Sequence, residues 1–256
     1  MSYLEDLFNL KNKVVVVTGG AGQLGTTICE AYKKAGAKPI ALDSVVPKYR
    51  LKDVEYHKLD ITKKADVIKV FDKLIKDHNS IDILINNAGV SVFEPFEERK
   101  EKSVDLVMDV NLKGTFFCIQ AYVNLFDKYR LEKGSIVNIG SFYGVISPDF
   151  RIYTDCSRKN SEIYGATKAG VIQMTRYFAA HLADRNIRVN AVSPGGIFNP
   201  GNPQGKDFIK EYSFRCPMKR MANGTEVVGA IIYLSSDAAS YTTGHNIITD
   251  GGMSCW

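Results

Sequence analysis

Seven short apolar segments recur along the chain, and each is bounded by glycine or by polar residues. The first, KVVVVTGG (13–20), is a continuous run of β-branched residues, which is typical of a parallel strand buried on both faces. The other six are KPIALD (38–43), VEYHKLD (54–60), IDILINNAG (81–89), GSIVNIGS (134–141), IRVNAVSPG (187–195) and HNIITDGG (245–252). We therefore predict seven strands.

Longer segments with apolar residues at helical spacing lie between these strands, at residues 22–37, 63–78, 102–129 and 164–186. This alternation predicts an α/β fold of the Rossmann type, a doubly wound, seven-stranded, mostly parallel sheet with helices on both faces. No linker composition or internal repeat interrupts it, so we predict a single domain over residues 1–256. Residues 145–160 and 198–216 are long connections, which usually serve as lids or binding loops.

The charge, the cysteine and histidine spacing and the length of the apolar runs argue against several classes of protein. The 33 basic and 28 acidic residues leave a net charge of +5 without a basic block, so we expect no nucleic-acid partner. Five scattered cysteines without CxxC spacing favour reduced thiols, and the four histidines lack metal-ligand spacing. No apolar run reaches the roughly 18 residues of a membrane span, and the N-terminus is unlike a signal peptide. We expect a cytoplasmic protein without a membrane or metal partner.

The segment TGGAGQLG (18–25) follows the first predicted strand and opens the first predicted helix. In that context a glycine-rich turn favours a dinucleotide-binding site. Gly19 permits the tight turn, Gly22 lets the backbone approach a pyrophosphate, and Gly25 allows the helix to pack closely on the strand. The free N–H groups of the helix favour phosphate. The alternative is a plain strand-to-helix turn.

Asp43 ends the second predicted strand. A carboxylate there accepts hydrogen bonds from the adenosine ribose and repels a 2′-phosphate. Neither of the next two residues, Ser44 and Val45, is basic. We therefore predict NAD as the cofactor, in preference to NADP. The alternative, that Asp43 is a helix N-cap, is disfavoured because Pro47 soon follows.

The segment YGATK (164–168) places Tyr164 and Lys168 four residues apart, on one face of a predicted helix. A free tyrosine has a pKa near 10, and a positive charge nearby lowers it by about 1 to 3 units. A tyrosine paired in this way can move protons near neutral pH. Taken alone, a pair of this kind is more often an ordinary surface pair.

Other polar residues accompany this pair. Ser141 follows a strand, at the carboxyl end where open α/β sheets bind ligands, and Asn111 lies in a predicted helix. These residues, with the ordered segments VVVVTGG, LDIT, NNAG, NLKGTF, GSIVNIGS, YGATKAG, IRVNAVSPGGI and ASYTTGHNIITDGG, resemble the short-chain dehydrogenase/reductase family in its single-domain form. The resemblance covers nearly the whole chain.

The resemblance implies roles for individual residues. Tyr164 would be the general acid/base, Lys168 would lower its pKa and hold the nicotinamide ribose, Ser141 would bind the reacting oxygen, and Asn111 would hold a proton-relaying water. The implied cofactor residues are Gly19, Gly22, Gln23, Leu24 and Gly25 in the turn, Asp43 at the ribose, Asp60 and Ile61 at the adenine, Asn87, Ala88 and Gly89 along the cleft, Tyr164 and Lys168, and Pro194, Gly195 and Ile197 at the nicotinamide.

A second tyrosine competes for the catalytic role. The family's spacing from Ser141 would place the tyrosine near Tyr153, but Tyr153 has no lysine four residues on. Tyr164 has Lys168 and the helix that follows. We therefore favour Tyr164 and interpret residues 145–160 as an insertion over the site.

Two single positions also depart from the family pattern. Gln23 stands where the short form usually has glycine, a spacing that looks more like longer relatives acting on nucleotide sugars. Asn199 stands where threonine is common, which puts its contact to the cofactor carboxamide in doubt.

Charges in the two long connections suggest a substrate class. The insertion carries Arg151 and Arg158, and residues 198–216 carry Lys206, Lys210 and Arg215. Arginines at an active-site rim grip phosphate or carboxylate, so one hypothesis is an anionic substrate such as a sugar phosphate or nucleotide sugar. Ordinary solvated charges are an equally good explanation. The chain is also similar to bacterial oxidoreductases that modify flagellin or surface-glycan sugars.

The resulting hypothesis is an NAD-dependent oxidoreductase that transfers a hydride between nicotinamide and a secondary alcohol or ketone on a sugar-like substrate. The alternatives are a 3-oxoacyl-carrier-protein reductase, a sugar-nucleotide epimerase or dehydratase that retains its cofactor, and a non-catalytic nucleotide-sensing protein. The resemblance further implies a homotetramer or homodimer, with residues 116–126 and the helix after Tyr164 at an interface.

Overall fold

The structure is a computed structural model that describes residues 2–154 and 160–255. Its strands form one parallel sheet in the order β3-β2-β1-β4-β5-β6-β7. The strands are β1 (Val14–Thr18), β2 (Lys38–Asp43), β3 (Glu55–Lys58), β4 (Ile83–Asn86), β5 (Gly134–Ile139), β6 (Ile187–Pro194) and β7 (Asn246–Thr249). The predicted Rossmann-type fold is therefore confirmed, and all seven strands run parallel.

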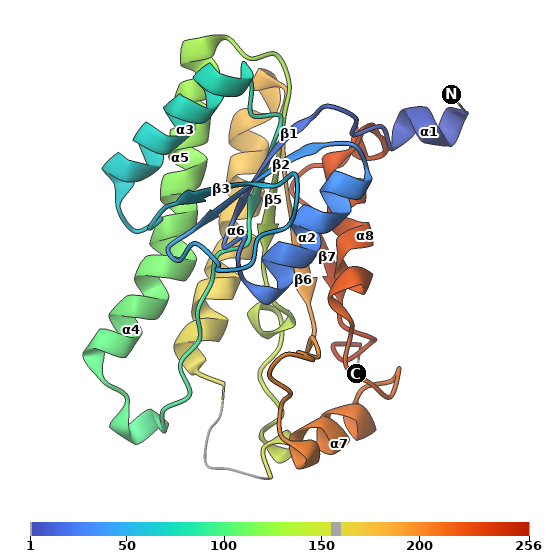
Figure 1. Cartoon of the computed structure of the whole chain (residues 1–256). Coiled ribbons are helices and arrows are strands. Elements are labelled where there is room, and N and C mark those ends of the chain that lie inside the picture. The colour runs from blue at the N-terminus through green and yellow to red at the C-terminus, as the bar shows by residue number, and fades with distance from the viewer. Residues whose placement is uncertain (1, 155–159, 256) are drawn as a thin grey trace.

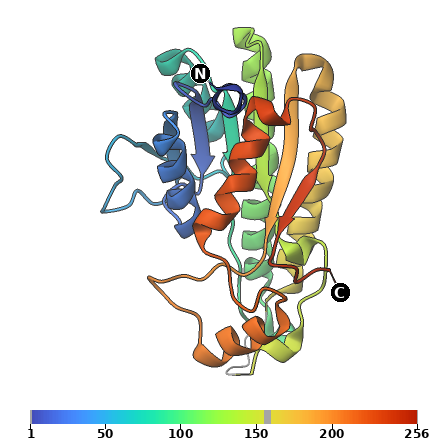
Figure 2. The same cartoon turned by 90° about the vertical axis from the view of Figure 1, so that its right-hand side faces the viewer.

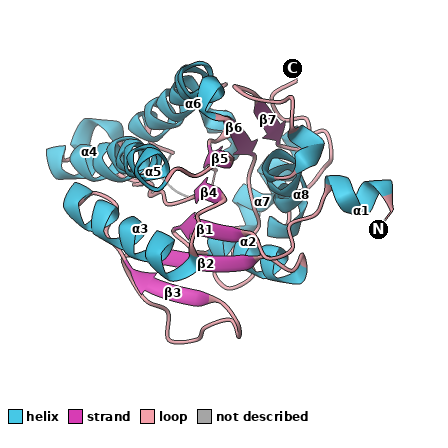
Figure 3. Cartoon of the chain, turned by 90° about the horizontal axis from the view of Figure 1, so that it is seen from above, coloured by secondary structure: helices cyan, strands magenta, loops and turns pink. Residues whose placement is uncertain are grey.

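Helices cover both faces of the sheet. Figure 3 shows α3, α4, α5 and α6 on one side of the strands and α2 and α8 on the other. The helices are α1 (Tyr3–Leu7), α2 (Gln23–Lys34), α3 (Lys64–His78), α4 (Glu101–Met108), α5 (Thr115–Tyr129), α6 (Glu162–Leu182), α7 (Lys206–Arg215) and α8 (Gly224–Ser235). None of the helices described is long and apolar enough to cross a membrane.

The two-sided burial explains the continuous apolar run of β1. Val14 and Val16 belong to the core cluster that includes α3 and α5, whereas Val15 and Val17 belong to the cluster that includes α2 and α8. All four side chains are buried because successive residues of a strand point to opposite faces. A strand with one solvated face would alternate apolar and polar residues instead.

Three of the described helices, the short α1 and the longer α7 and α8, are absent from the sequence prediction. α8 begins with a capping box between Asn223 and Glu226, a local signal that marks its start. α7 occupies part of residues 198–216, which were predicted to be a loop, so that prediction is wrong for Lys206–Arg215. α7 forms because Phe208, Ile209 and Tyr212 share one face, which packs into a third apolar cluster.

The long helix predicted over residues 102–129 is divided. α4 passes into a π-helical turn at Asp109–Gly114, and α5 continues from it. π-helical turns are frequent at functional sites. This turn carries Asn111, one of the predicted site residues.

The described parts of the two long connections lie beyond the carboxyl ends of the strands. Figures 1 and 2 show α7 and the segment after β5, as far as residue 154, at this end of the molecule. That segment includes a short 3₁₀ turn at Phe150–Ile152. Arg158 lies outside the residues that the structure describes.

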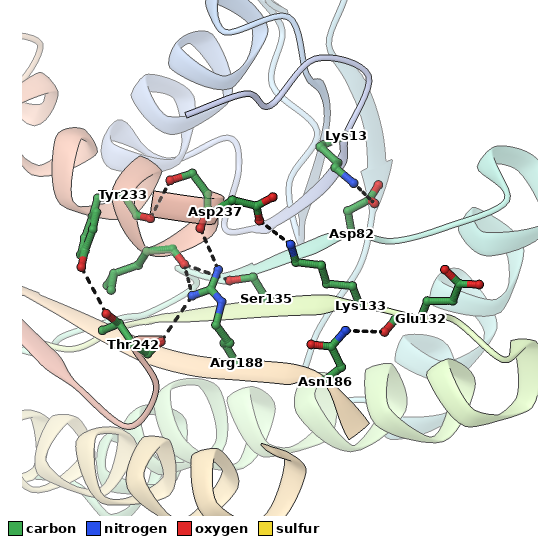
Figure 4. A network of polar contacts seen from close by, with 12 residues as sticks. Lys13, Asp82, Glu132, Lys133, Ser135, Asn186, Arg188, Tyr233, Asp237 and Thr242 are labelled. Carbon is green, nitrogen blue, oxygen red and sulfur yellow. Dashed lines mark hydrogen bonds and ion pairs between the residues drawn. The ribbon is translucent and has the colours of Figure 1, made fainter. Parts of the chain in front are cut away.

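The opposite end of the sheet is held by Arg188, which lies at the start of β6 (Figure 4). Its guanidinium donates hydrogen bonds to the carbonyl oxygens of Leu234 at 2.7 Å, Ser236 at 3.1 Å and Thr242 at 3.4 Å. These bonds satisfy carbonyl groups at the end of α8, where a positive charge is favourable. The hydrogen bonds of Arg188 thus stabilise the amino end of the sheet. The polar residues that are candidates for binding or catalysis lie at the carboxyl ends of the strands.

Candidate active site

A cleft of about 790 Å³ runs along the carboxyl ends of the strands. In the sheet, β2 and β3 lie on one side of β1, and β4 lies on its other side. The cleft lies at this reversal of strand order, where open α/β sheets bind their ligands. The predicted residues that line it are Gly19, Gly22, Gln23, Leu24, Gly25, Asp43, Asp60, Ile61, Asn87, Ala88, Gly89, Ser141, Tyr164, Lys168, Pro194, Gly195 and Ile197. Folding thus brings segments from the whole chain to one surface.

The glycine turn is packed too tightly for side chains at Gly19, Gly20 and Gly25. Gly19 has φ +62°, and a Cβ atom there would lie 2.7 Å from the Cα atom of Ala88. A Cβ atom on Gly25 would lie 2.1 Å from the carbonyl oxygen of Gly19. These contacts place the start of α2 directly against the end of β1.

The start of α2 is suited to an anion. Gly22 is its N-cap and provides no side-chain hydrogen bond, so no side chain caps the first N–H groups of the helix. A Cβ atom on Gly22 would approach only the Gly19 carbonyl oxygen within 4 Å, at 3.3 Å. The open backbone and the positive end of the helix fit the phosphates of a dinucleotide.

Asn87 fixes this turn to the neighbouring strand. Its Nδ2 atom donates hydrogen bonds of 3.0 Å to the carbonyl oxygens of Thr18 and Gly19. The Thr18 hydroxyl oxygen in turn accepts from the N–H groups of Asn87 and Ala88, each at 3.1 Å. The ends of β1 and β4 are therefore held as one rigid floor of the cleft.

Asp43 is oriented by the backbone on both sides. Its Oδ2 atom accepts a hydrogen bond from the Ala21 N–H and its Oδ1 atom from the Val45 N–H, each at 3.1 Å. The carboxylate lines the cleft and keeps further lone pairs free to accept hydroxyl groups. This position fits the ribose of a dinucleotide whose phosphates lie at α2.

Tyr164 is set in the first turn of α6. The hydroxyl oxygen of Ser161 caps that helix by accepting a hydrogen bond of 3.1 Å from the Tyr164 N–H. Burial raises the pKa of the Tyr164 phenol above its usual value, while a hydrogen bond with Ser141 lowers it. The N-terminal end of a helix also favours a phenolate over a phenol.

Lys168 lies one turn along the same helix and is buried. Its Nζ atom is 5.7 Å from the centroid of the Tyr164 ring and donates a hydrogen bond of 2.7 Å to the carbonyl oxygen of Ile139. Burial lowers the pKa of Lys168 to about 8. In this arrangement the hydrogen bond with Ser141 acts directly on the Tyr164 phenol, while the Lys168 ammonium lies over the Tyr164 ring.

Asn111 does not line the cleft but supports it from behind. Its Oδ1 atom accepts a hydrogen bond of 2.8 Å from the Val90 N–H, and its Nδ2 atom donates to the Val90 carbonyl oxygen at 2.9 Å and to Thr167 Oγ1 at 3.2 Å. The π-helical turn therefore connects the segment after β4 to α6. This linkage holds the helix that carries Tyr164 and Lys168 in place.

Two residues that the sequence prediction missed lie near Tyr164. Ser91 and Asn160 both line the cleft, and the Ser91 hydroxyl donates a hydrogen bond of 3.2 Å to Asn160 Oδ1. Ser91 follows the NNAG segment at the carboxyl end of a strand, which is a signal that sequence reasoning can use. Asn160 lies at the end of a long connection, where no local pattern marks it.

Tyr153 and Arg151 lie away from the cleft lining. Tyr153 packs against the third apolar cluster, with its ring 5.4 Å from that of Phe208, and its hydroxyl is hydrogen-bonded to Tyr143. Arg151 is 79% exposed and forms two hydrogen bonds with the carboxylate of Asp149, at 2.9 and 2.8 Å. Of the two tyrosines, only Tyr164 faces the cleft together with Ser141 and Lys168.

Comparisons with known proteins find relatives that match nearly the whole chain. A family model described as enoyl-(acyl carrier protein) reductase matches residues 20–254. The chain is 37% identical over 254 residues to the 3-oxoacyl-(acyl-carrier-protein) reductase FabG of Thermotoga maritima, covering 95% of this chain and 98% of that protein. It is 34% identical over 279 residues to the ribulose-forming D-arabinitol 2-dehydrogenase of Candida tropicalis, covering 97% and 95%.

A solved structure is also similar. The crystal structure of a short-chain dehydrogenase from Leptospira borgpetersenii serovar Hardjo-bovis with bound NAD⁺ superposes with a TM-score of 0.90 and 39% sequence identity. The similarity covers 99% of this chain and 96% of that one.

Proposed function

Because the chain belongs to the short-chain dehydrogenase/reductase family, and is thus an oxidoreductase of alcohol and keto groups, we propose a specific activity within it. We propose that it interconverts a secondary alcohol and a ketone on a neutral, sugar-like substrate with NAD. The observation that carries the proposal is that Tyr164 and Lys168 line the same cleft as Asp43. That cleft thus combines a proton-transferring group with an acceptor for a ribose.

Asp43 supports NAD in preference to NADP. Its carboxylate is held by the Ala21 and Val45 N–H groups, so it cannot swing away from a 2′-phosphate without losing both bonds. The similar Leptospira protein contains NAD⁺. We infer that the uncapped start of α2 holds the phosphates and that Asp60 and Ile61 line the adenine end.

The side chains of this chain supply the proton chemistry, and the bound nicotinamide supplies or accepts the hydride. During alcohol oxidation Tyr164 accepts the hydroxyl proton, and during ketone reduction it returns a proton to the carbonyl oxygen. When substrate binds, the single O–H of Ser141 turns from Tyr164 to the reacting oxygen and stabilises the charge that develops on it. Lys168 supports the phenolate electrostatically from one turn along α6.

The charges around the cleft favour a neutral substrate. Arg151, which the sequence suggested as an anion-binding residue, already pairs with Asp149, and Arg215 pairs with both Asp149 and Glu211. The carboxylates of Asp149 and Glu211 compensate the charges of these arginines, so the arginines attract a phosphate only weakly. A polyol or sugar, whose hydroxyl groups would be held by uncharged groups such as Ser91 and Asn160, agrees with this pattern and with the similarity to D-arabinitol 2-dehydrogenase.

A 3-oxoacyl-carrier-protein reductase is the second candidate, because the chain is 37% identical to FabG. In such a reaction Ser141 and Tyr164 of this chain would bind and protonate the carbonyl oxygen of the 3-oxoacyl substrate. The two candidates differ in the substrate, and Asp43 argues against an NADPH-specific reductase.

The test is a panel of substrates with NAD and NADP. NADH formation with polyols or sugars, and none with sugar phosphates or nucleotide sugars, is the expected result. Faster turnover with a 3-oxoacyl thioester would favour the second candidate. Stoichiometric nucleotide in the purified protein without net NADH formation would indicate an epimerase or dehydratase, and nucleotide binding without any turnover would indicate a sensing protein.

We also propose that the protein is a homodimer or homotetramer. Phe116 on α5 and Tyr177 on α6 are exposed, and Phe116 and Tyr177 each contact the ring of Phe178 between them. An aromatic surface of this kind suits a contact between subunits. Light scattering of the purified protein tests this, and a monomer at micromolar concentration would contradict it.

A further inference from the structure

Gln23, which stands where the short family form usually has glycine, contacts the far side of the cleft. Its Nε2 atom donates a hydrogen bond of 2.7 Å to the carbonyl oxygen of Phe198. Gln23 is the first residue of α2, whereas Phe198 follows β6, 175 residues later in the chain. Because Gln23 and Ile197 both line the cleft, this bond crosses from the glycine turn to the segment after β6.

Backbone hydrogen bonds with Ala222 hold the segment around Phe198, which Gln23 contacts. The Phe198 N–H donates to the Ala222 carbonyl oxygen, and the Ala222 N–H donates to the Gly196 carbonyl oxygen, each at 2.9 Å. Gln204 Nε2 donates a hydrogen bond of 2.9 Å to the Ile197 carbonyl oxygen and closes the residues between them into a compact loop. We refer to residues 198–205 as the strap loop.

The Gln23 bond joins the strap loop to the part of the cleft that fits phosphates. The uncapped N–H groups of α2 begin at Gln23 itself, so a phosphate held there lies beside the bond. Figure 1 shows that the connection between β6 and α7 lies beyond the carboxyl ends of the strands. A glycine at position 23 has no side chain and leaves the strap loop unattached to the turn.

We propose that Gln23 is a positioning residue that fastens the strap loop across the cleft and slows the release of the nucleotide. The proposal rests on the proposed function, because it takes NAD as the bound molecule. The Gln23 bond must open for a nucleotide to pass, whereas the hydrogen bonds of Ala222 with Phe198 and Gly196 hold the base of the loop.

The substitution Gln23→Met tests the strap, because methionine has a similar length and helix propensity but no N–H donor. We expect NADH to dissociate roughly 2- to 10-fold faster, the range that corresponds to the loss of one neutral hydrogen bond. Stopped-flow fluorescence of bound NADH measures this rate. Gln204→Met is the matched control, since it loosens the strap loop internally and leaves the Gln23 bond, and we expect its rate to stay within about twofold of wild type.

A second measurement needs no nucleotide. Amide hydrogen exchange within residues 198–205 should be faster in Gln23→Met than in the wild-type protein. If the wild-type protein does not bind NADH, the proposed function fails, and the exchange measurement still decides whether the strap exists. An unchanged exchange rate, an unchanged NADH dissociation rate, or an equal effect of Gln204→Met would overturn the proposal.

Discussion

Lys168 lies over the ring of Tyr164, with its Nζ atom 5.7 Å from the ring centroid, and donates a hydrogen bond to Ile139 at the end of β5. The phenol itself is hydrogen-bonded with Ser141. The lysine charge therefore lies over the ring and is anchored to the sheet at Ile139, while the serine is hydrogen-bonded to the phenol in the cleft. Substitution of each of the three side chains should therefore change a different property: the rate for Tyr164, the pH profile for Ser141 and the pH dependence of stability for Lys168.

Replacement of Tyr164 by phenylalanine should lower kcat/KM by about 10²- to 10⁴-fold, the usual contribution of a general acid/base. Tyr153→Phe is the matched control and should retain activity, because Tyr153 packs against Phe208 outside the cleft lining. NADH binding measured by fluorescence should be similar in both variants. Activity that survives Tyr164→Phe but not Tyr153→Phe would show that the proton passes through the other tyrosine.

Ser141→Ala should move the pH profile of alcohol oxidation to higher pH. The Ser141 hydrogen bond lowers the Tyr164 pKa, so its loss leaves burial as the dominant influence and raises that pKa further. Alcohol oxidation requires the Tyr164 phenolate. The rising limb of kcat/KM against pH therefore shifts to higher pH, in addition to any decrease of the maximal kcat/KM. A reduced rate with an unshifted limb would contradict this effect of Ser141.

Lys168→Met should change how stability depends on pH in the nucleotide-free protein. Burial lowers the folded-state pKa of Lys168 from 10.5 to about 8, so the cost of burying its charge is fully present below pH 8. Between pH 8 and about 10.5 the unfolded chain binds the extra proton, and the wild-type free energy of unfolding should rise relative to the variant by at most about 3 kcal/mol. Urea unfolding of both proteins from pH 7 to 10 measures this difference, and a constant difference would refute it.

Asp43→Asn should reduce the preference for NAD over NADP by at least about tenfold, which corresponds to ~1.4 kcal/mol, because it removes the charge that repels a 2′-phosphate. The ratio of NADH and NADPH dissociation constants measures the preference. Asp60→Asn is a control in the same cleft, since the Asp60 carboxylate accepts hydrogen bonds from Thr62. It should weaken both nucleotides alike, and an unchanged ratio in Asp43→Asn would mean that another residue selects the cofactor.

Arg188→Met should destabilise the fold by about 2–4 kcal/mol, because it leaves the carbonyl oxygens of Leu234 and Ser236 without their charged donor. Lys133→Met provides the comparison, since Lys133 pairs with Asp237 at an exposed position and should cost less than about 1 kcal/mol. Chemical unfolding measures both. Because Arg188 lies at the amino end of the sheet, the folded fraction of either variant should keep its nucleotide affinity.

The fold was largely predictable because parallel strands buried on both faces produce unmistakable apolar runs. The run of four valines in β1 and the glycines that follow it indicate a buried strand and a turn from local residues alone. The helices that were missed show where this signal weakens. α8 is apolar around most of its surface, and α7 gains its stability from packing against the third apolar cluster, which no local pattern reveals.

The sequence by itself determined the strand order along the chain, the glycine turn and the pairing of Tyr164 with Lys168, because each depends on residues a few positions apart. Only the tertiary structure decided that Asn111 holds Val90, that Ser141 bonds to Tyr164, and that Gln23 reaches Phe198. The physical reason is distance along the chain. Contacts between remote segments depend on how whole helices and strands pack, and packing is set by the summed burial of many residues rather than by any one motif.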